Sequence, residues 1–256
     1  MLPVRSSILF LCCAVISQVA SAPNSPPAKL PKTFKRCKKL DPNLPDCLRT
    51  AVQGVIPEFV KGVPSLGVLP LDPLELKTLV IEQGDGPVSI KLDFKDLFIH
   101  GIASAVITSV TSNLKNYTIN LAAELKKPII LDGMYNVHGK VLILPITGTG
   151  KCKLVLEGFR AKIGIKGKAV TKNGIKYMEV QTFKFGLSTT KLRVKLENLF
   201  NGDKALGDNM NVFLNENWED ILKELQPGFE DSLSQAFLEI SNRVFTKVPF
   251  DQIFLD

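Results

Sequence analysis

The chain has 256 residues, with 32 basic and 25 acidic side chains and a formal net charge of +7. Hydrophobic residues make up 45% of it, which is enough for a buried core and excludes an intrinsically disordered chain. Because it holds only 2 histidines, a histidine-rich metal site is excluded, and a histidine-dependent catalytic site has two candidates, His100 and His138.

The first 22 residues have the pattern of a secretory signal peptide. Arg5 precedes an apolar run over residues 8–16, and small residues follow as Ala20-Ser21-Ala22. The run is shorter than the roughly 20 apolar residues that span a bilayer. We therefore expect cleavage after residue 22 or one residue earlier, a secreted, extracellular protein, and one mature domain over residues 23–256. An uncleaved N-terminal membrane anchor is the alternative.

The cysteines agree with secretion. Of the 5 cysteines, Cys12 and Cys13 lie in the signal sequence, so Cys37, Cys47 and Cys152 remain. A proline-containing segment that can reverse the chain separates Cys37 from Cys47, and an oxidising compartment favours a disulfide between them. Cys152 has no partner left, and its place in an alternating strand pattern predicts a buried free thiol.

A helix is predicted to follow Cys37. Asp41 or Asn43 can cap it, Pro45 suits its first turn, and apolar residues recur at helical spacing through Phe59. Pro57 is expected to bend or end the helix. Beyond this helix, residues 62–75 contain too many prolines and glycines for regular structure.

From about residue 77 to 200 apolar and polar residues alternate, which predicts consecutive antiparallel strands. Turns are expected at residues 84–86, 132–133, 148–150 and 172–174, where Asn173-Gly174 is the strongest hairpin signal. Glycines within the strand patterns indicate bulges and bends, so the sheet is expected to be strongly curved. These glycines are Gly158, Gly164 and Gly167.

The last quarter of the chain is predicted to form a helix that lies inside the curved sheet. Large apolar residues form one helical stripe over residues 210–225, and the stripe continues over residues 229–244 beyond Pro227-Gly228. One long kinked helix, or two helices in line, is expected to end before Pro249. The predicted fold class is α+β, with a long C-terminal helix wrapped by a strongly curved antiparallel β-sheet.

No catalytic or metal-binding motif accompanies the two histidines. Residues 148–151 are similar to part of a phosphate-binding loop but lack its leading glycine and its final serine or threonine. The sequence contains no G-x-S-x-G, H-E-x-x-H or C-x-x-C motif. We predict that the protein is not an enzyme and that it has no metal site and no cofactor. An esterase that uses His100 or His138 on a bound lipid ester ranks last among the hypotheses.

Basic residues crowd residues 29–39 and recur along strand patterns between residues 151 and 195. Nucleic acid is not an expected partner, because the chain has a single Trp and no platform of basic and aromatic residues. Solvated strand faces account for the charge, and a weak attraction to anionic membrane surfaces is kept as an alternative. Asn116-Tyr117-Thr118 is a sequon, which makes Asn116 a candidate glycosylation site.

The segment Leu199–Asn211 (LFNGDKALGDNMN), followed by Phe213–Trp218 (FLNENW), resembles the signature block of insect takeout-like proteins, which belong with the juvenile-hormone-binding proteins. The Cys37/Cys47 pair, the proline-rich segment Pro64–Pro73 and the terminal segment Val248–Phe254 are similar to the same family, so the resemblance covers essentially the whole mature chain. Hormone-binding members carry a second disulfide, for which this chain has only Cys152, and this places it nearer the takeout branch.

The resemblance implies an internal apolar pocket or tunnel and extracellular carriage of a small hydrophobic ligand, such as an isoprenoid, a juvenile-hormone-like molecule or a fatty-acyl lipid. It also implies a link to biological rhythms in insects. We expect a monomer. A membrane-facing lipid-binding protein that acts at anionic surfaces is the alternative function.

The inward phase of the strands and of the helix predicts the residues that line such a tunnel. From the strands these are Phe94, Leu121, Leu131, Val141, Leu156, Phe159 and Phe183, and from the helix Phe213, Trp218, Leu222, Phe229 and Phe237. For each of them, core packing without ligand contact is the alternative. Three tyrosines, Tyr117, Tyr135 and Tyr177, are candidates to donate a hydrogen bond to a ligand headgroup if they face inward.

Overall fold

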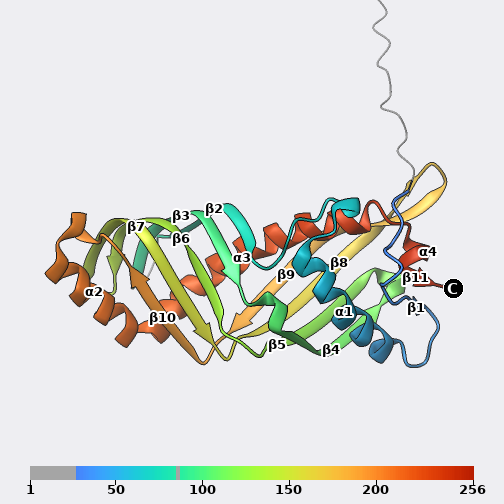
Figure 1. The fold of residues 1–256 in the computed structure, drawn as a ribbon, viewed down its shortest axis with the longest axis horizontal. Coiled ribbons are helices and arrows are strands. Elements are labelled where there is room, and N and C mark those ends of the chain that lie inside the picture. The colour runs from blue at the N-terminus through green and yellow to red at the C-terminus, as the bar shows by residue number, and fades with distance from the viewer. Residues whose placement is uncertain (1–26, 85–86) are drawn as a thin grey trace, which may run out of the picture.

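The computed structural model describes residues 27–84 and 87–256 (Figure 1). The predicted signal peptide and residues 85–86 of the first predicted turn lie outside the described residues. Among the residues described, the main strands form a five-stranded antiparallel sheet in the order β10-β7-β6-β3-β2 and a four-stranded antiparallel sheet in the order β4-β5-β8-β9.

Each strand of these sheets follows a period-two segment of the sequence. The five-stranded sheet contains β2 (Leu74–Gln83), β3 (Val88–His100), β6 (Ile129–Val141), β7 (Leu144–Glu157) and β10 (Lys191–Leu196). The four-stranded sheet contains β4 (Ala105–Asn113), β5 (Thr118–Leu125), β8 (Arg160–Lys172) and β9 (Ile175–Ser188). The predicted antiparallel strands are thereby confirmed.

The two sheets are the halves of one long curved ribbon. β3 leads into β4, β5 into β6, β7 into β8 and β9 into β10, and the partner strands stand in the same order in both sheets. The four connections therefore lie on one line across the ribbon, where it bends (Figure 1). Glycine is required there: a Cβ on Gly101 would lie 2.5 Å from the carbonyl oxygen of Pro128, and one on Gly158 would lie 2.4 Å from Oγ1 of Thr190.

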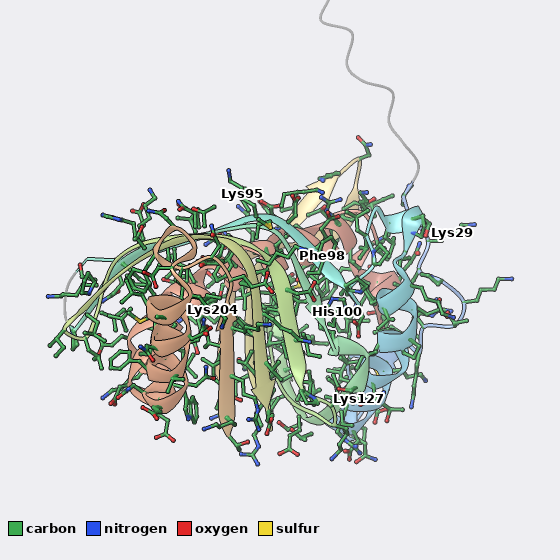
Figure 2. The ribbon with its side chains drawn as sticks, turned by 60° about the vertical axis from the view of Figure 1, so that its left-hand side comes forward. Lys29, Lys95, Phe98, His100, Lys127 and Lys204 are labelled. Atoms are coloured by element: carbon green, nitrogen blue, oxygen red, sulfur yellow. A yellow bond between two sulfur atoms is a disulfide. The ribbon has the colours of Figure 1, made fainter. Side chains whose placement is uncertain are left out.

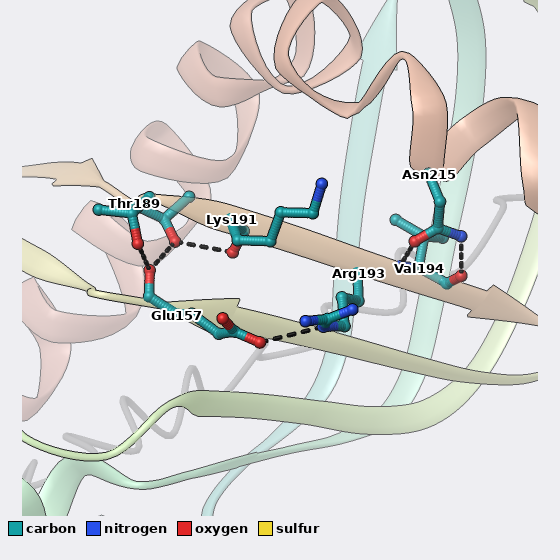
Figure 3. Close-up of polar contacts among 7 residues, drawn as sticks. Glu157, Thr189, Lys191, Arg193, Val194 and Asn215 are labelled. Carbon is teal, nitrogen blue, oxygen red and sulfur yellow. Dashed lines mark hydrogen bonds and ion pairs between the residues drawn. The ribbon is translucent and has the colours of Figure 1, made fainter.

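Hydrogen bonds hold the last of these connections in place. Oγ1 of Thr189 and Oγ1 of Thr190 both donate to the carbonyl oxygen of Glu157, at 2.5 and 3.0 Å. The Glu157 carboxylate accepts a further bond from Nε of Arg193 at 3.0 Å (Figure 3). The polar residues at this bend thus fix β10 against β7, while the strand faces stay apolar on the inside.

Two predicted turns are wrong, because their glycines lie inside strands. Gly133 is within β6 beside the register shift of β3, where a Cβ would lie 2.8 Å from the carbonyl oxygen of Asp96. Gly150 is within β7, and a Cβ there would lie 2.3 Å from the carbonyl oxygen of Glu197. Both glycines permit a close approach of backbones. The Asn173-Gly174 hairpin is confirmed, with φ of 51° and 76°, and Gly167 lies at a register shift as expected.

The first helix, α1 (Leu44–Lys61), starts where the sequence predicts, with Pro45 in its first turn. It does not end at Pro57, because apolar residues on both sides of this proline pack onto the core, Ile56 beside β4 residues and Phe59 against Phe34. The segment that follows holds a short 3-10 turn, Pro64–Leu66. At the same end of the molecule β1 (Cys37–Lys38) pairs in parallel with β11 (Phe254–Leu255), beside α4 (Phe250–Ile253).

The C-terminal stripe forms two consecutive helices, α2 (Lys204–Glu216) and α3 (Trp218–Phe245), which meet at an angle at one end of the molecule, and α3 runs along the long axis inside the curved ribbon (Figure 1). The break lies at Asn217, whereas α3 continues through Pro227. Asp203 caps α2 by accepting a hydrogen bond from the N–H of Leu206. The fold class is otherwise as predicted. Within the described part of the chain, no helix has both the length and the apolarity that crossing a membrane requires.

Side-chain amides join the helices to the sheet edges. On α2, Oδ1 of Asn215 accepts from the N–H of Val194 at 2.9 Å, and its Nδ2 donates to the carbonyl oxygen of the same residue at 2.7 Å (Figure 3). Asn211 forms the same pair of bonds with Leu196, and on α3 Asn242 does so with Val180. Each amide takes the place of a neighbouring strand, so the edges β10 and β9 are covered.

Asn215→Leu is expected to lower the free energy of unfolding by about 2–4 kcal/mol, because it leaves an N–H and a C=O of β10 without partners. Chemical denaturation followed by circular dichroism measures the change. Asn209→Leu, on the exposed side of the same helix, is the matched control and should change stability little. Equal midpoints for Asn215→Leu and the unmodified protein would show that this amide does not hold the edge.

Candidate ligand-binding cavity

A cavity of about 330 Å³ lies between the curved ribbon and α3. Residues of both sheets form its wall. Val52 and Ile56 of α1 line one end, and Leu214 and Trp218 at the α2–α3 junction line the other. Among the described residues, all that line it are Val, Ile, Leu, Ala, Phe or Trp. The cavity therefore runs through much of the length of the fold with an apolar wall, and its volume lies in the range of ligand sites.

The strand pattern explains this wall. Successive inward residues of β3, among them Ile90, Leu92 and Phe94, face the cavity, while Lys91, Asp93 and Lys95 alternate with them. On the opposite side α3 presents Trp218, Leu222, Leu225 and Phe229 at helical spacing. The space stays open because the ribbon curves around α3, so that the two apolar surfaces do not meet along their whole length.

Ten of the twelve predicted lining residues lie in this wall. They are Phe94, Leu121, Leu131, Val141, Leu156, Phe159, Trp218, Leu222, Phe229 and Phe237. Whether they contact a ligand stays a prediction.

Phe183 and Phe213 are not among the residues of the wall. Phe183 points inward, but it lies where a second core fills the end of the ribbon, and its ring stacks on Phe237 with centroids 5.6 Å apart. Phe213 is half-buried against the main core, and its neighbour Leu214 is the residue of α2 that reaches the cavity. Sequence reasoning missed Ala123 and Ala161, which pair directly across β5 and β8 in the wall. The alternating pattern gives their phase, but a small alanine side chain does not stand out in the sequence as a ligand contact.

None of the three tyrosines lines the cavity, so the expected headgroup donor is not found. The hydroxyl of Tyr135 donates to the carbonyl oxygen of Glu197 at 2.7 Å, and burial raises its pKa to about 12. The ring of Tyr117 packs edge-on against Phe250, with Lys176 over its face. The ring of Tyr177 carries Lys172 over its face. All three therefore have structural contacts outside the wall.

The histidines and the free cysteine also lie outside the wall. Nε2 of His100 is 2.9 Å from Oδ1 of Asp132 on the outer surface, beside Lys127 (Figure 2), and His138 is exposed. Cys152 is a buried free thiol, as predicted. Burial raises its pKa to about 11, so it stays protonated at neutral pH and is a poor nucleophile. In the described ranges, no group of three or more His, Cys, Asp or Glu side chains is placed to hold a metal ion.

Two covalent features are predicted near the surface, a disulfide between Cys37 and Cys47 and a glycan on Asn116. The Cys37–Cys47 disulfide is present and ties the N-terminal segment to α1. Asn116 is exposed at the end of a 3-10 turn, Leu114–Asn116, where its N–H donates to Oδ1 of Asn113. Its glycosylation stays a prediction.

The family model for haemolymph juvenile hormone binding proteins matches residues 8–255. The chain belongs to this family. It is 30% identical over 234 residues to the circadian clock-controlled protein daywake of Drosophila melanogaster, with 88% of each chain covered. It is 23% identical over 208 residues to a Schistocerca gregaria protein named as a candidate beta-carotene binder, covering 81% of this chain and 82% of that one.

The fold agrees with a solved member. The crystal structure of Epiphyas postvittana Takeout 1 matches with a TM-score of 0.76 and 27% identity, and the match covers 87% of this chain and all of that chain. The resemblance to takeout-like proteins is thereby confirmed. The family is named for binding juvenile hormone and the Schistocerca gregaria relative for binding beta-carotene, and both of these molecules are hydrophobic.

Proposed function

We propose that this protein is a secreted, monomeric carrier that encloses a small hydrophobic ligand in the apolar cavity. The supporting observation is the wall itself, which is apolar over the cavity's length from α1 to the α2–α3 junction. Isoprenoids, juvenile-hormone-like esters and fatty-acyl lipids are the ligand classes that such a wall suits. The ten predicted lining residues in the wall are the proposed ligand contacts.

The energetics are consistent with useful affinity. A ligand of about 15 carbons gains up to about 12 kcal/mol on leaving water, at about 0.8 kcal/mol per methylene. Loss of translational and rotational freedom costs about 4 kcal/mol or more. The remainder is at most about 8 kcal/mol, which corresponds to a dissociation constant of about 1 μM. Transport then consists of partition into the cavity and shielding from water, and no bond is made or broken.

Secretion belongs to the same proposal. The signal-like sequence over residues 1–22 lies outside the described residues, and residues 23–256 are proposed as the mature domain. The Cys37–Cys47 disulfide suits an oxidising compartment. The exposed sequon at Asn116 suits passage through the secretory pathway.

One preparation tests all of these points. Protein collected from the medium of secreting insect cells is expected to start at residue 22 or 23 by intact mass, with added mass if Asn116 carries a glycan. Mass spectrometry of its organic extract is expected to find a lipid-like species in near-stoichiometric amount that a matched secreted control protein lacks. An empty extract, followed by no uptake of isoprenoid or fatty-acyl ester probes, would contradict the carrier.

A further inference from the structure

The charge of the molecule is unevenly distributed. The β8–β9 hairpin, residues 160–188, holds seven basic residues and one acidic residue, and residues 27–40 hold six basic residues and none that are acidic. Residues 203–224, which form α2 and the start of α3, hold six acidic residues and two basic ones. The N-terminal segment with Lys29 and helix α2 with Lys204 lie at opposite ends of the molecule (Figures 1 and 2). The protein therefore has a basic end and an acidic end.

On the basic half of the molecule, three lysines form a cluster on the outer face of the four-stranded sheet, nearer the bend of the ribbon than the tip of the β8–β9 hairpin. Lys162 and Lys166 lie on β8, and Lys184 lies on β9 directly opposite Gly164, midway between them. All three side chains are exposed. Diagonal neighbours across antiparallel strands are about 7–8 Å apart, so the three positive charges share one small area.

The acidic groups nearest to this cluster have other partners: Glu124, diagonal to Lys162, pairs with Arg160, and Oε1 of Glu230, near Gly186, accepts from the N–H of Leu187. Elsewhere on the hairpin Lys168 pairs with Glu179. In the described part of the chain no ion pair involves the three clustered lysines, and their cross-strand partners are uncharged: Ala122, Gly186, Thr118, Thr182 and Gly164. Like charges gathered on one sheet face repel one another, and among the described residues no ion pair with these three lysines relieves this repulsion. An anionic partner outside the molecule would relieve it.

We propose that the outer face of β8 and β9 around Lys162, Lys166 and Lys184 docks on an anionic phospholipid bilayer. Lysines on an open sheet face are attracted to the negative potential of such a surface. No aromatic side chain points outward among them, unlike the stacking platforms of proteins that bind single-stranded nucleic acid. The proposal builds on carriage of a hydrophobic ligand, because the inward residues of the same strands, among them Ile163 and Phe185, line the cavity.

Vesicle binding tests this surface. The full-length mature protein is mixed with phosphatidylcholine vesicles that contain or lack about one-third phosphatidylserine, at ionic strengths of about 0.05 and 0.5 M. We expect binding to the anionic vesicles only, with loss at high salt. The triple variant Lys162→Gln/Lys166→Gln/Lys184→Gln is expected to bind about 100-fold more weakly, from about fivefold per lysine.

The matched control is Lys151→Gln/Lys153→Gln/Lys195→Gln, which removes the same charge from exposed positions on the outer face of the five-stranded sheet. It should bind vesicles nearly as well as the unmodified protein. Equal losses in both triple variants would show that net charge acts without a docking face and would overturn the proposal. So would failure of the unmodified protein to bind anionic vesicles, or binding to heparin or to an acidic protein in their place.

Ligand uptake separates this inference from the carrier function. An isoprenoid ester probe is expected to bind the Lys162/Lys166/Lys184 variant as it binds the unmodified protein, because the three side chains point away from the cavity. If the probe binds normally but vesicle binding does not depend on these lysines, the proposed docking face is wrong, and the proposed carrier function is unaffected. If no protein takes up the probe, the carrier itself fails.

Discussion

A long-chain fatty acid is expected to bind at least 100-fold more weakly at pH 7 than its methyl ester of the same chain length. The reason is the wall of the cavity, in which every described lining residue is apolar. A carboxylate placed there would lose its water and gain neither a hydrogen-bond donor nor a positive charge. Burial of an unpaired charge costs so much that such a group takes up a proton instead.

The size and the pH dependence of this effect follow from the protonation of the ligand. A free carboxylic acid has a pKa of about 4.3, so at pH 7 only about one molecule in 500 is neutral. Binding of the neutral form raises the pKa of the bound acid, since burial disfavours the charged form. The affinity of the protein for the acid therefore has its full value at pH values below the pKa of the unbound acid. Above that pKa the affinity decreases about tenfold per pH unit. Affinity for the ester does not change over the same range.

Competition against one fluorescent probe, with acid and ester titrated between pH 4 and 8, measures this difference. The control is thermal unfolding at each pH, which shows that the protein remains folded. Equal affinity for acid and ester at pH 7 would mean that a polar or charged group meets the carboxylate. The head of the ligand would then lie outside the apolar cavity. Esters and isoprenoids would no longer be preferred over fatty acids as the proposed ligand classes.

Strand and helix phase could be predicted from the sequence, because alternation of apolar residues is a local property. This is why the sequence predicts ten residues of the wall, such as Phe94 and Leu131. Whether an inward residue lies along the cavity or beyond its end is not a local property, because it depends on contacts between distant elements. Phe183 has the correct phase, yet it lies where a second core closes the space, and that depends on where Phe237 and β9 meet.

The roles of two glycines and of the lysine cluster could likewise not be predicted from local sequence. Gly133 and Gly150 were predicted as turns, but each serves a close approach by a distant backbone, at Asp96 and at Glu197. The lysine cluster depends on the register that sets Lys184 opposite Gly164. Register and close approach are properties of the assembled sheet, so the outer face at β8 and β9 could not be defined by single-strand patterns.

Ala123→Phe is expected to lower the affinity for a ligand of about 15 carbons by roughly 1,000-fold. Ala123 and Ala161 are directly paired across β5 and β8, and both line the cavity, so two small side chains lie side by side in the wall at this point. A phenyl ring there takes the place of about five ligand methylenes. At about 0.8 kcal/mol for each, the loss is about 4 kcal/mol.

The neighbouring residue provides a matched control. Ala122 lies on the other face of β5, opposite Lys162, and does not line the cavity. Ala122→Phe adds the same ring to the same strand and should leave the affinity for the probe unchanged. Titration of an isoprenoid ester probe into both variants measures the difference, and thermal unfolding shows whether Ala123→Phe is folded despite an overpacking cost of about 1–3 kcal/mol.

The two variants together separate a filled cavity from a cavity that is irrelevant to binding. A folded Ala123→Phe protein with undiminished affinity would place the ligand outside the space between the ribbon and α3. A shorter probe adds a second criterion, since a ligand that fits beside the new ring loses fewer methylene contacts than a long one. Loss of affinity that grows with chain length, seen in Ala123→Phe and absent in Ala122→Phe, is the result that only an internal site produces.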